Sequence, residues 1–320
     1  MSVLLALIAI GAPATAWSKS PRPKAEPNGA ARDWSRHPAI VEVATPEDVF
    51  ALGDVHGAHE RLAALLVSAG LIKPDGPSEA GYAWAGGKRV LVVVGDVIDK
   101  ADQSLASIDL LIALEAGAEA AGGRVIVTIG NHEAEFLADP SNKKAKREFD
   151  KELTAHSLDR EEVAAGRGRY GEWLVHRPLA AKVNGWFFAH GGRTDGSSIS
   201  ALADAYRKAV DSNNWGSKAL VGKDSILKAQ KWWKAGTIDA SLTALGARHI
   251  VFGHDPGAFE APGSIIQRFE GKLFKIDVGM SPAVDFSHGA LLLIHATESG
   301  EEATSVDAAG KSTSIWKGSK

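Results

Sequence analysis

Five segments of this sequence pair glycine with side chains that bind metals or move protons. They are Gly53-Asp54-x-His56, Gly95-Asp96-x-x-Asp99, Gly130-Asn131-His132, His190-Gly191 and Gly253-His254. A single histidine after a strand is more often structural than a ligand, but five such clusters in series are hard to explain by coincidence. Carboxylate, imidazole and amide donors together suit first-row divalent or trivalent metals better than Ca²⁺ alone. The residue types therefore predict a metal centre.

Each cluster directly follows or ends a short apolar run that is typical of a buried strand. The central run, residues 90–94, stops at Gly95 and delivers two carboxylates three residues apart, Asp96 and Asp99. Glycine lets the chain turn sharply there, and ligands bind at this end of the strands in open α/β sheets. Further strands are predicted over residues 49–52, 125–129, 183–189 and 250–252.

The spacing of apolar residues predicts helices between these strands, over residues 61–69 and 105–120. Three strand–turn–helix units in a row indicate parallel strands joined by crossover helices, which is an α/β arrangement. Residues 198–234 are expected to be mostly helical. Residues 265–269, 273–276 and 290–294 are expected to form sequential antiparallel strands.

The composition restricts the classes of binding partner and of metal-binding side chain. The chain has 320 residues, 45% of them hydrophobic and 23% charged, and its formal net charge is −3. This charge gives no reason to expect nucleic acid or an anionic membrane as a partner. The absence of cysteine excludes thiol nucleophiles, disulfides and thiolate metal sites. Any metal must therefore be held by His, Asp, Glu or Asn.

The two ends of the chain differ from its middle. An apolar run over residues 3–10 followed by Ala14-Thr15-Ala16 predicts a signal peptide over residues 1–16, and hence a periplasmic or secreted protein. No Lys or Arg precedes Lys19, so a cytoplasmic protein with a hydrophobic N-terminal helix remains the alternative.

Residues 17–39 are predicted as a flexible linker, 40–302 as the folded domain and 303–320 as a polar tail with only its first residues ordered. Within the domain, residues 139–169 form a charged helical insertion, either solvated or a cap over the site.

In this order, the motifs Gly-Asp-x-His-Gly, Gly-Asp-x-x-Asp, Gly-Asn-His-Glu and Gly-His resemble those of the calcineurin-like metallophosphoesterase superfamily. His190-Gly191-Gly192 resembles its phosphoprotein phosphatase branch, and the chain looks most like the Shewanella-like protein phosphatases. The resemblance covers about residues 48–295. It implies a four-layer αββα sandwich of two mixed sheets flanked by helices, where periodicity alone supports only an α/β fold with parallel strands.

The resemblance also implies roles for individual residues. One metal ion would be held by Asp54, His56 and Asp96, and a second by Asp96, Asn131, His190 and His254. The ions would be Mn, Fe or Zn, and the hydroxide that bridges them would attack phosphorus. His132, oriented by Asp99, would give a proton to the leaving oxygen. Glu133 would be a structural carboxylate.

Two phosphate-binding arginines of the family are lysines in this chain. Lys100 follows Asp99 where the family has Asp-Arg-Gly, and Lys234 stands in Trp232-Trp233-Lys234-Ala235. Lysine offers a point charge without the planar fork of arginine. Arg193 either compensates or is structural.

The expected activity is hydrolysis of a phosphomonoester, either on a phosphorylated peptide or on a small phosphoester. Nucleic acid is not expected as a partner, nor is stable membrane association after signal cleavage. Two alternatives remain open. Asp102-Gln103-Ser104 keeps a dinucleotide polyphosphate hydrolase in view, and the two lysines leave room for a metal-loaded phospho-ligand-binding protein without turnover.

Overall fold

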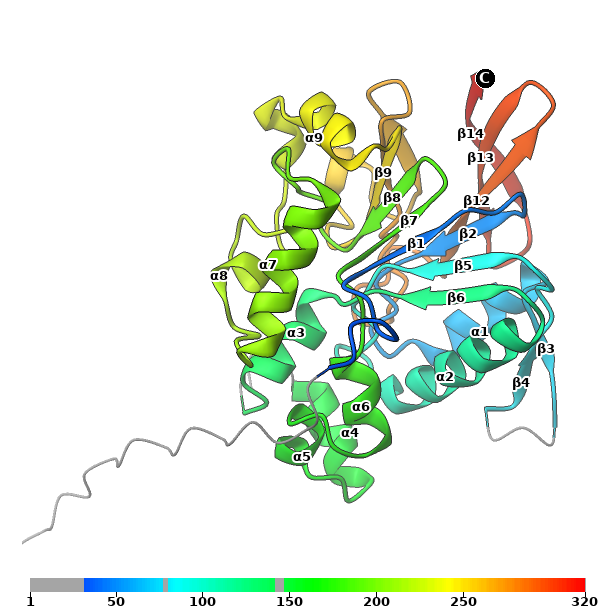
Figure 1. Ribbon diagram of the computed structural model, residues 1–320. Helices are drawn as coiled ribbons and strands as arrows, with labels where there is room; N and C mark the ends of the chain where they lie inside the picture. The colour runs from blue at the N-terminus through cyan, green and yellow to red at the C-terminus, as the bar shows by residue number, and fades with distance from the viewer. Residues whose placement is uncertain (1–31, 77–79, 142–146, 320) are drawn as a thin grey trace, which may run out of the picture.

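The computed structural model describes residues 32–76, 80–141 and 147–319, which form an α/β fold (Figure 1). Within these ranges the strands make two mixed six-stranded sheets and one two-stranded hairpin. Helices flank both sheets, which confirms the predicted fold class. The predicted signal peptide and residues 17–31 of the predicted linker lie outside the described residues.

The first sheet has the strand order β14-β13-β12-β2-β5-β6. Its strands β2 (Val49–Leu52), β5 (Val90–Val93) and β6 (Arg124–Val127) are parallel. All four residues of β5 are buried, as expected for an apolar run inside a covered sheet. Parallel pairing puts the carboxyl ends of the three strands at one edge, so the loops that follow them meet there.

Helices α1 (His59–Ser68) and α2 (Ser104–Ala120) connect these strands and cover one face of their sheet (Figure 1). Leu62, Leu65 and Leu66 of α1 are buried, because they share one side of the helix. Between the two helices, β3 (Ile72–Pro74) and β4 (Tyr82–Trp84) form an antiparallel hairpin.

The second sheet has the strand order β1-β7-β8-β9-β11-β10. Its parallel strands β8 (Trp186–Ala189) and β9 (His249–Phe252) lead to the remaining two clusters. The other strands of this sheet are β1 (Ile40–Val43), β7 (Ala180–Val183), β10 (Ile266–Arg268) and β11 (Leu273–Lys275). The helices around it are α3 (Asn131–Ala138), α7 (Ile199–Asp211), α8 (Lys218–Val221), α9 (Ile238–Leu245) and the 3₁₀ turns η1 (Trp232–Ala235) and η2 (Ala258–Glu260).

Two predictions about strands were wrong. Residues 183–189 are not one strand, because β7 turns at Asn184-Gly185 and pairs antiparallel with β8. Asn-Gly is a strong two-residue hairpin signal, and Asn184 has the positive φ of 52° that such turns need. Of the three later strands, only β10 and β11 pair antiparallel with each other, while β12 (Ala290–Thr297) joins the other sheet beside β2.

The predicted polar tail was also wrong. Residues from Gly300 onward form the antiparallel strands β13 (Gly300–Asp307) and β14 (Ser312–Ser319). Gly300, Ala303 and Val306 of β13 are buried, whereas the other positions are half-buried. Such a strand looks polar in sequence because only one face packs on the core, so the folded domain extends beyond residue 302.

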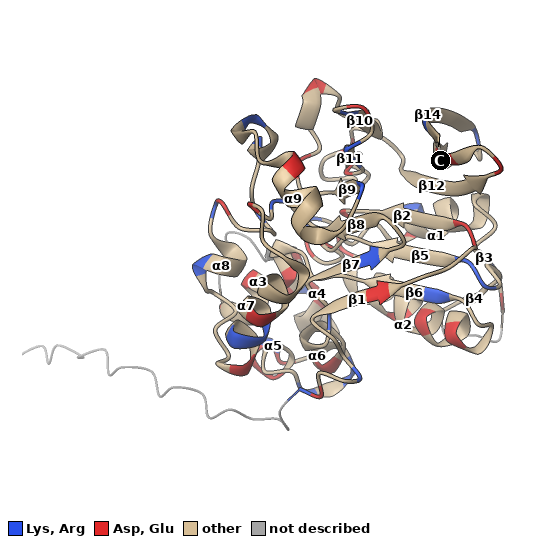
Figure 2. Ribbon diagram, turned by 45° about the horizontal axis from the view of Figure 1, so that its top comes forward, with Lys and Arg blue, Asp and Glu red and all other residues tan. Residues whose placement is uncertain are grey.

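The described part of the predicted insertion is helical. Helices α4 (Arg147–Ala155), α5 (Arg160–Ala164) and α6 (Gly168–Val175) carry charges of both signs (Figure 2). Helix α4 is not merely solvated, since Phe149 and Leu153 are fully buried. The ring of Phe149 packs edge-on against that of Phe136 in α3, with centroids 4.9 Å apart.

The end of the predicted flexible linker is held in place, which corrects the prediction for residues 32–39. The Arg32 guanidinium donates hydrogen bonds to the backbone carbonyls of Val175, His176 and Arg177, at the end of α6. These carbonyls have no partner within the helix, so Arg32 caps it. Among the described residues, no helix has the length and apolar character needed to cross a membrane.

Candidate metal centre

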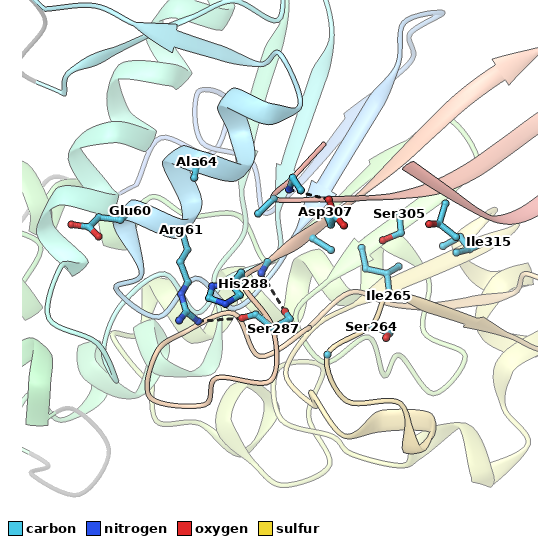
Figure 3. A pocket seen from close by; sticks show the side chains of 16 residues that line it. Glu60, Arg61, Ala64, Ser264, Ile265, Ser287, His288, Ser305, Asp307 and Ile315 are labelled. Atoms are coloured by element: carbon cyan, nitrogen blue, oxygen red, sulfur yellow. Dashed lines mark hydrogen bonds between the residues drawn. The ribbon is translucent and has the colours of Figure 1, made fainter. Parts of the chain in front are cut away.

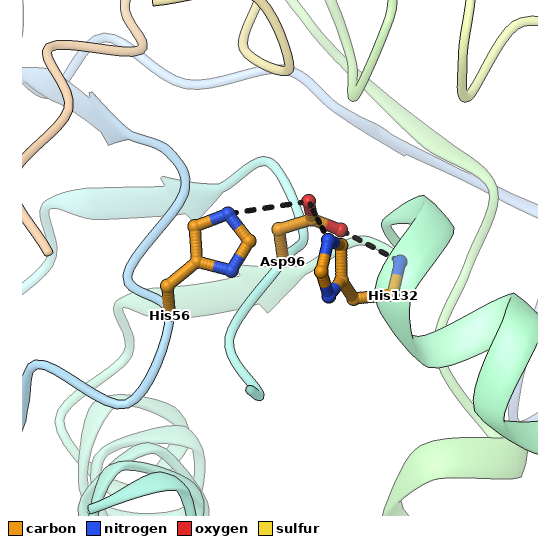
Figure 4. A group of neighbouring side chains, drawn as sticks. All are labelled: His56, Asp96 and His132. Atoms are coloured by element: carbon orange, nitrogen blue, oxygen red, sulfur yellow. Dashed lines mark hydrogen bonds and ion pairs between the residues drawn. The ribbon is translucent and has the colours of Figure 1, made fainter. Parts of the chain in front are cut away.

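The loops after β2, β5, β6, β8 and β9 bring the predicted ligands together in two groups. In one group, a ligand atom from each of His56, Asp96 and His132 lies within 4.8 Å of the others. In the second group, the same holds for Asp96, His190 and His254. Figure 4 shows the Asp96 carboxylate between the imidazoles of His56 and His132. Asp96 is therefore the residue that both groups share.

A single oxygen of Asp96 is surrounded by imidazole nitrogens. Its Oδ2 lies 3.5 Å from His56 Nε2 and 3.3 Å from His190 Nε2. The same oxygen is 3.9 Å from His132 Nε2. The side chain of Asp96 is only 3% exposed, so its charge must be balanced by neighbours rather than by water.

The two other predicted ligands lie beside these groups. Asn131 Oδ1 is 3.1 Å from His190 Nε2. The Asp54 carboxylate accepts the backbone N–H of His254, at 3.0 and 3.1 Å. The charge of Asp96 also acts on Asp54. All six predicted metal ligands are thus neighbours in the fold.

Backbone carbonyls orient the histidines for binding a cation. His56 Nδ1 lies 3.1 Å from the carbonyl oxygen of Ile98, and His190 Nδ1 lies 2.7 Å from that of Val94. Because a carbonyl can only accept, each Nδ1 carries the proton and donates it. That leaves Nε2, which faces Asp96, as the nitrogen available to a metal ion. This is the arrangement that metal-ligating histidines use.

The glycines of the motifs are needed for close approach. A Cβ at Gly130 would lie 2.2 Å from Asp96 Oδ1, and one at Gly253 would lie 2.1 Å from Asp54 Oδ2. Real side chains do not come so close. Each glycine therefore makes room for a carboxylate from a neighbouring loop, in addition to any turn that it allows.

Several residues of the site loops have unusual backbone conformations. Left-handed φ angles between 48° and 71° occur at Asp54, His56, Asp96, Asp99, Lys100 and His254. Such conformations cost on the order of 1–3 kcal/mol each and persist only where surrounding contacts enforce them, often at functional sites. The clustering supports a functional role for these loops.

The charges of the site favour a cation. Burial raises the pKa of Asp54 well above its usual range, and the nearby charges of Asp277 and Asp96 raise it further. For Asp96, burial acts in the same direction, but the imidazoles around it, His190 first, hold its pKa well below the usual range. Burial in turn lowers the pKa of His56 well below normal, which keeps the ring neutral. Burial would also lower the pKa of His190, but the charge of Asp96 and the hydrogen bond with it raise this pKa to about 10. Buried carboxylates beside imidazoles are a donor set that fits first-row metal ions.

His132 differs from the other histidines because its second nitrogen meets a carboxylate. Its Nδ1 lies 3.1 Å from Asp99 Oδ2, while its Nε2 points toward Asp96. Burial would raise the pKa of Asp99, but the hydrogen bond with His132 and the charge of that ring keep it below the usual value. An ionised carboxylate on Nδ1 fixes the ring and stabilises a proton on Nε2.

Glu133 holds two of the loops together. Its Oε2 accepts the backbone N–H groups of Asp96 and Gly130, at 3.0 and 2.8 Å. Its Oε1 accepts those of Val97 and Ile98, at 2.8 and 3.1 Å. The side chain is 1% exposed. The carboxylate thus fixes the geometry between Asp96 and the start of α3.

Sequence reasoning missed a buried pair behind Asp54. Lys275 is 0% exposed and donates to the backbone oxygens of Pro256, Ala261 and Asp277. Burial lowers the pKa of Lys275 to about 8 and raises that of Asp277 to about 6. A signal was present, since Lys and Asp interrupt the apolar run of residues 273–278. Alternation alone does not say whether such residues face solvent or the core.

The three predicted substrate-binding residues have different surroundings. Lys100 is exposed, and its Nζ lies 2.7 Å from His56 Nε2. The Arg193 guanidinium is paired with the carboxylates of Asp195 and Asp224. Lys234 is exposed in η1, two residues after Trp232, whose Nε1 donates to the Gly191 carbonyl oxygen. Lys100 is thus in contact with a predicted ligand, whereas a phosphate would have to displace two carboxylates from Arg193.

A cavity of ≈ 1070 Å³ lies beside the first half of α1, between the loop at residues 263–265 and the β13–β14 hairpin (Figure 3). The predicted ligands do not line it. Its Arg61 already donates to the carbonyls of Met280 and Ser287 and pairs with Asp285. This cavity is therefore separate from the candidate metal centre.

The fold and the two clusters define an α/β protein with a candidate two-metal site at the ends of parallel strands. Residues 48–258 match the family model of calcineurin-like phosphoesterases, which is more than half of the chain. The chain belongs to that family, and the resemblance seen in its motifs is confirmed.

Two similar sequences are named Shewanella-like protein phosphatases. Phosphatase 2 of Arabidopsis thaliana is 38% identical over 28% of this chain and 21% of its own length. Phosphatase 1 of Plasmodium berghei is 31% identical over 45% and 38%. A symmetrical bis(5'-nucleosyl)-tetraphosphatase of Paraburkholderia phymatum is 26% identical over 55% and 54%. The chain thus spans between about a fifth and about half of the length of these relatives.

Solved structures support the fold. A cold-active protein-tyrosine phosphatase of a psychrophilic Shewanella species has a TM-score of 0.69 and 22% identity, with 86% of this chain and 82% of that one covered. A Saccharomyces cerevisiae protein serine/threonine phosphatase has a TM-score of 0.60 and 17% identity, with 90% and 86% covered. At such identities the likeness concerns the fold alone.

Proposed function

We propose that this chain is a metal-dependent phosphoester hydrolase that acts on phosphomonoesters, with phosphorylated peptides as its substrates. The observation that carries the proposal is the Asp96 carboxylate, which two clusters of ligand atoms share. One ion would be held by Asp54, His56 and Asp96. The other would be held by Asp96, Asn131, His190 and His254. Mn, Fe and Zn all suit these donors.

Two cations bound at such a site would neutralise phosphoryl oxygens and acidify a water molecule. The protein's own contribution is to place the proton donor. His132 gives its Nδ1–H to Asp99, so the proton available to a leaving oxygen is the one on Nε2. The Asp99 carboxylate stabilises the doubly protonated ring until that proton is transferred.

The names of the similar proteins support a phosphatase acting on phosphorylated protein. The tetraphosphatase relative favours a second candidate, hydrolysis of dinucleotide polyphosphates. A metal-loaded binding protein without turnover is the third, motivated by the lysines at positions 100 and 234. Export to the periplasm or beyond, proposed from residues 1–16, argues against the second candidate because such nucleotides are cytosolic. A cytoplasmic location would remove that argument.

A substrate panel decides among the three. Purified protein is supplied with Mn²⁺ and offered phosphotyrosine and phosphoserine peptides, mononucleotides, dinucleotide polyphosphates and p-nitrophenyl phosphate. We expect phosphate release from the peptides and the aryl phosphate, and none after chelation with EDTA. Turnover confined to dinucleotide polyphosphates would support the second candidate. Metal binding without turnover of any ester would support the third.

Lys100→Arg tests the substrate contact. We expect a several-fold lower KM for aryl phosphates, because a guanidinium binds phosphate in a bidentate fork and an ammonium does not. Steady-state kinetics of the variant and of Lys73→Arg, an exposed lysine on β3, measure the change. An unchanged or higher KM in Lys100→Arg would count against contact between Lys100 and phosphate.

A further inference from the structure

Helix α4 of the insertion reaches the proposed proton-donor pair. The backbone N–H groups of Glu148 and Phe149, in the first turn of α4, donate to Asp99 Oδ1, at 3.1 and 3.4 Å. The other oxygen of the same carboxylate, Oδ2, is the one on His132 Nδ1. Asp99 thus bridges the start of α4 and the imidazole. These amides have no partner within the helix, and the helix N-terminus favours a negative charge.

A second path leads from Asp99 back to the same helix. The backbone N–H of Asp99 donates to Ser104 Oγ, at 3.0 Å. The backbone N–H groups of Ser104 and Leu105, which begin α2, donate to the carboxylate of Glu152, at 2.8 Å each. Glu152 lies on α4, three residues after Phe149. The hydrogen bonds therefore form a closed ring through Asp99, Ser104, Glu152 and the start of α4.

The ring is shielded from water and holds a strained segment. Ser104 and Phe149 are fully buried, and Glu152 is 9% exposed. Asp99 and Lys100 both have left-handed φ angles, 71° and 65°, which non-glycine residues rarely keep without support. With both oxygens engaged and its backbone N–H held, the Asp99 side chain has one orientation. Without α4, Oδ1 would face water and the carboxylate could rotate away from His132.

We propose that α4 is a positioning element for proton donation: its first-turn amides and Glu152 hold Asp99 so that Asp99 holds His132. The inference rests on the proposed function, because it concerns the proton that His132 gives to the leaving oxygen. In this role, part of the charged insertion belongs to the site and is not merely a solvated segment.

The leaving group distinguishes this role from a merely structural one. A proton donor matters most when the departing oxygen is a strong base, as in an alkyl phosphate. It matters little for p-nitrophenyl phosphate, whose leaving anion is stable. General acid catalysis contributes typically about 10²–10⁴-fold. A misplaced His132 must therefore slow alkyl esters far more than the activated aryl ester, whereas general loosening of the fold slows both alike.

Glu148→Pro removes one of the two amides from Asp99. Proline is tolerated in the first turn of a helix, so α4 can still form. We expect kcat for phosphoserine peptide to fall about tenfold more than kcat for p-nitrophenyl phosphate, with unchanged KM and unchanged metal content by mass spectrometry. Lys151→Ala is the matched control, because it breaks the exposed Glu148–Lys151 pair and leaves the ring intact. An equal loss on both esters, or no loss, would overturn the proposal.

Three further measurements distinguish loss of the positioning role from misfolding of the Glu148→Pro variant and from absence of the proposed activity. Glu152→Gln, which breaks the ring elsewhere, is expected to show the same dependence on the leaving group. In a His132→Ala background, Glu148→Pro should have no additional effect, since both act through one imidazole.

Nitrogen NMR of labelled histidine in metal-free protein should show His132 as the Nδ1–H tautomer in the wild type and as a tautomer mixture in Glu148→Pro. An unchanged tautomer overturns the positioning role. If the wild type hydrolyses no ester, only the proposed function fails, and the NMR result still decides the role of α4.

Discussion

Asp96→Asn is expected to release metal from the protein and to lower kcat/KM for phosphoester hydrolysis by at least about a thousandfold. The substitution keeps the size of the side chain and leaves one oxygen. Oδ1 of Asp96 accepts the backbone N–H of His132, at 2.9 Å, and the amide oxygen of Asn can do the same. What disappears is the negative charge and the Oδ2 atom that His56 and His190 surround. Both proposed ions depend on that atom, so both should be weakened together.

Metal content and activity are measured on the same preparation. Plasma mass spectrometry gives the number of ions per chain, titration calorimetry with Mn²⁺ gives the affinities, and p-nitrophenyl phosphate gives kcat/KM. Asp204→Asn, at an exposed position on α7, is the control and should behave as the wild type. Full activity in Asp96→Asn, or two ions bound as tightly as before, would contradict the shared-ligand site.

Glu133→Gln is expected to lower the free energy of unfolding by roughly 2–4 kcal/mol, because buried backbone donors lose their acceptor. The carboxylate accepts four N–H groups, two on each oxygen. A glutamine has only one oxygen, and its NH₂ group would face two of those donors. The loops that carry Asp96 and Asn131 should then move apart, which should also weaken metal binding.

Urea unfolding of the metal-free protein measures this effect without a contribution from bound ions. An unchanged slope with a lower midpoint would place the loss in native-state stability. Glu172→Gln, at an exposed position of α6, is expected to change the midpoint little. Equal midpoints for Glu133→Gln and the wild type would show that the four hydrogen bonds do not hold the loops.

Local sequence patterns predicted the strands that carry the site. Residues 49–52 are strand β2 as predicted, and residues 90–94 contain β5. Short apolar runs with turn signals at their ends are typical of buried strands. Patterns failed where a strand has one polar face, as in β13, and where a turn lies inside an apolar stretch, as at Asn184-Gly185. For β13 the missing information was which face meets the core, whereas the Asn-Gly hairpin signal at positions 184 and 185 was present in the sequence.

The ring around Asp99 could not have been found from the sequence. Ser104 and Glu152 are separated by 48 positions, and neither belongs to a recognisable motif. Glu152 stands in a run of mixed charges, where a solvated carboxylate is the ordinary expectation. Only the packing of Phe149 and Leu153 turns α4 inward and buries that carboxylate. The same holds for Lys275 and Asp277, whose burial depends on the two sheets being in place.

The sequence by itself determined the family, most of the strands that lead to the site and the six predicted ligands, Asp96 among them, that lie together there. It could do so because the ends of parallel strands meet at one edge of a sheet, so a motif after each strand fixes where its side chains lie. The tertiary structure decided which oxygen of Asp99 meets His132, how Glu133 joins two loops, and that α4 closes a ring behind the proposed proton donor. These are contacts between side chains and backbone groups far apart in the chain, so the local spacing of residues cannot predict them.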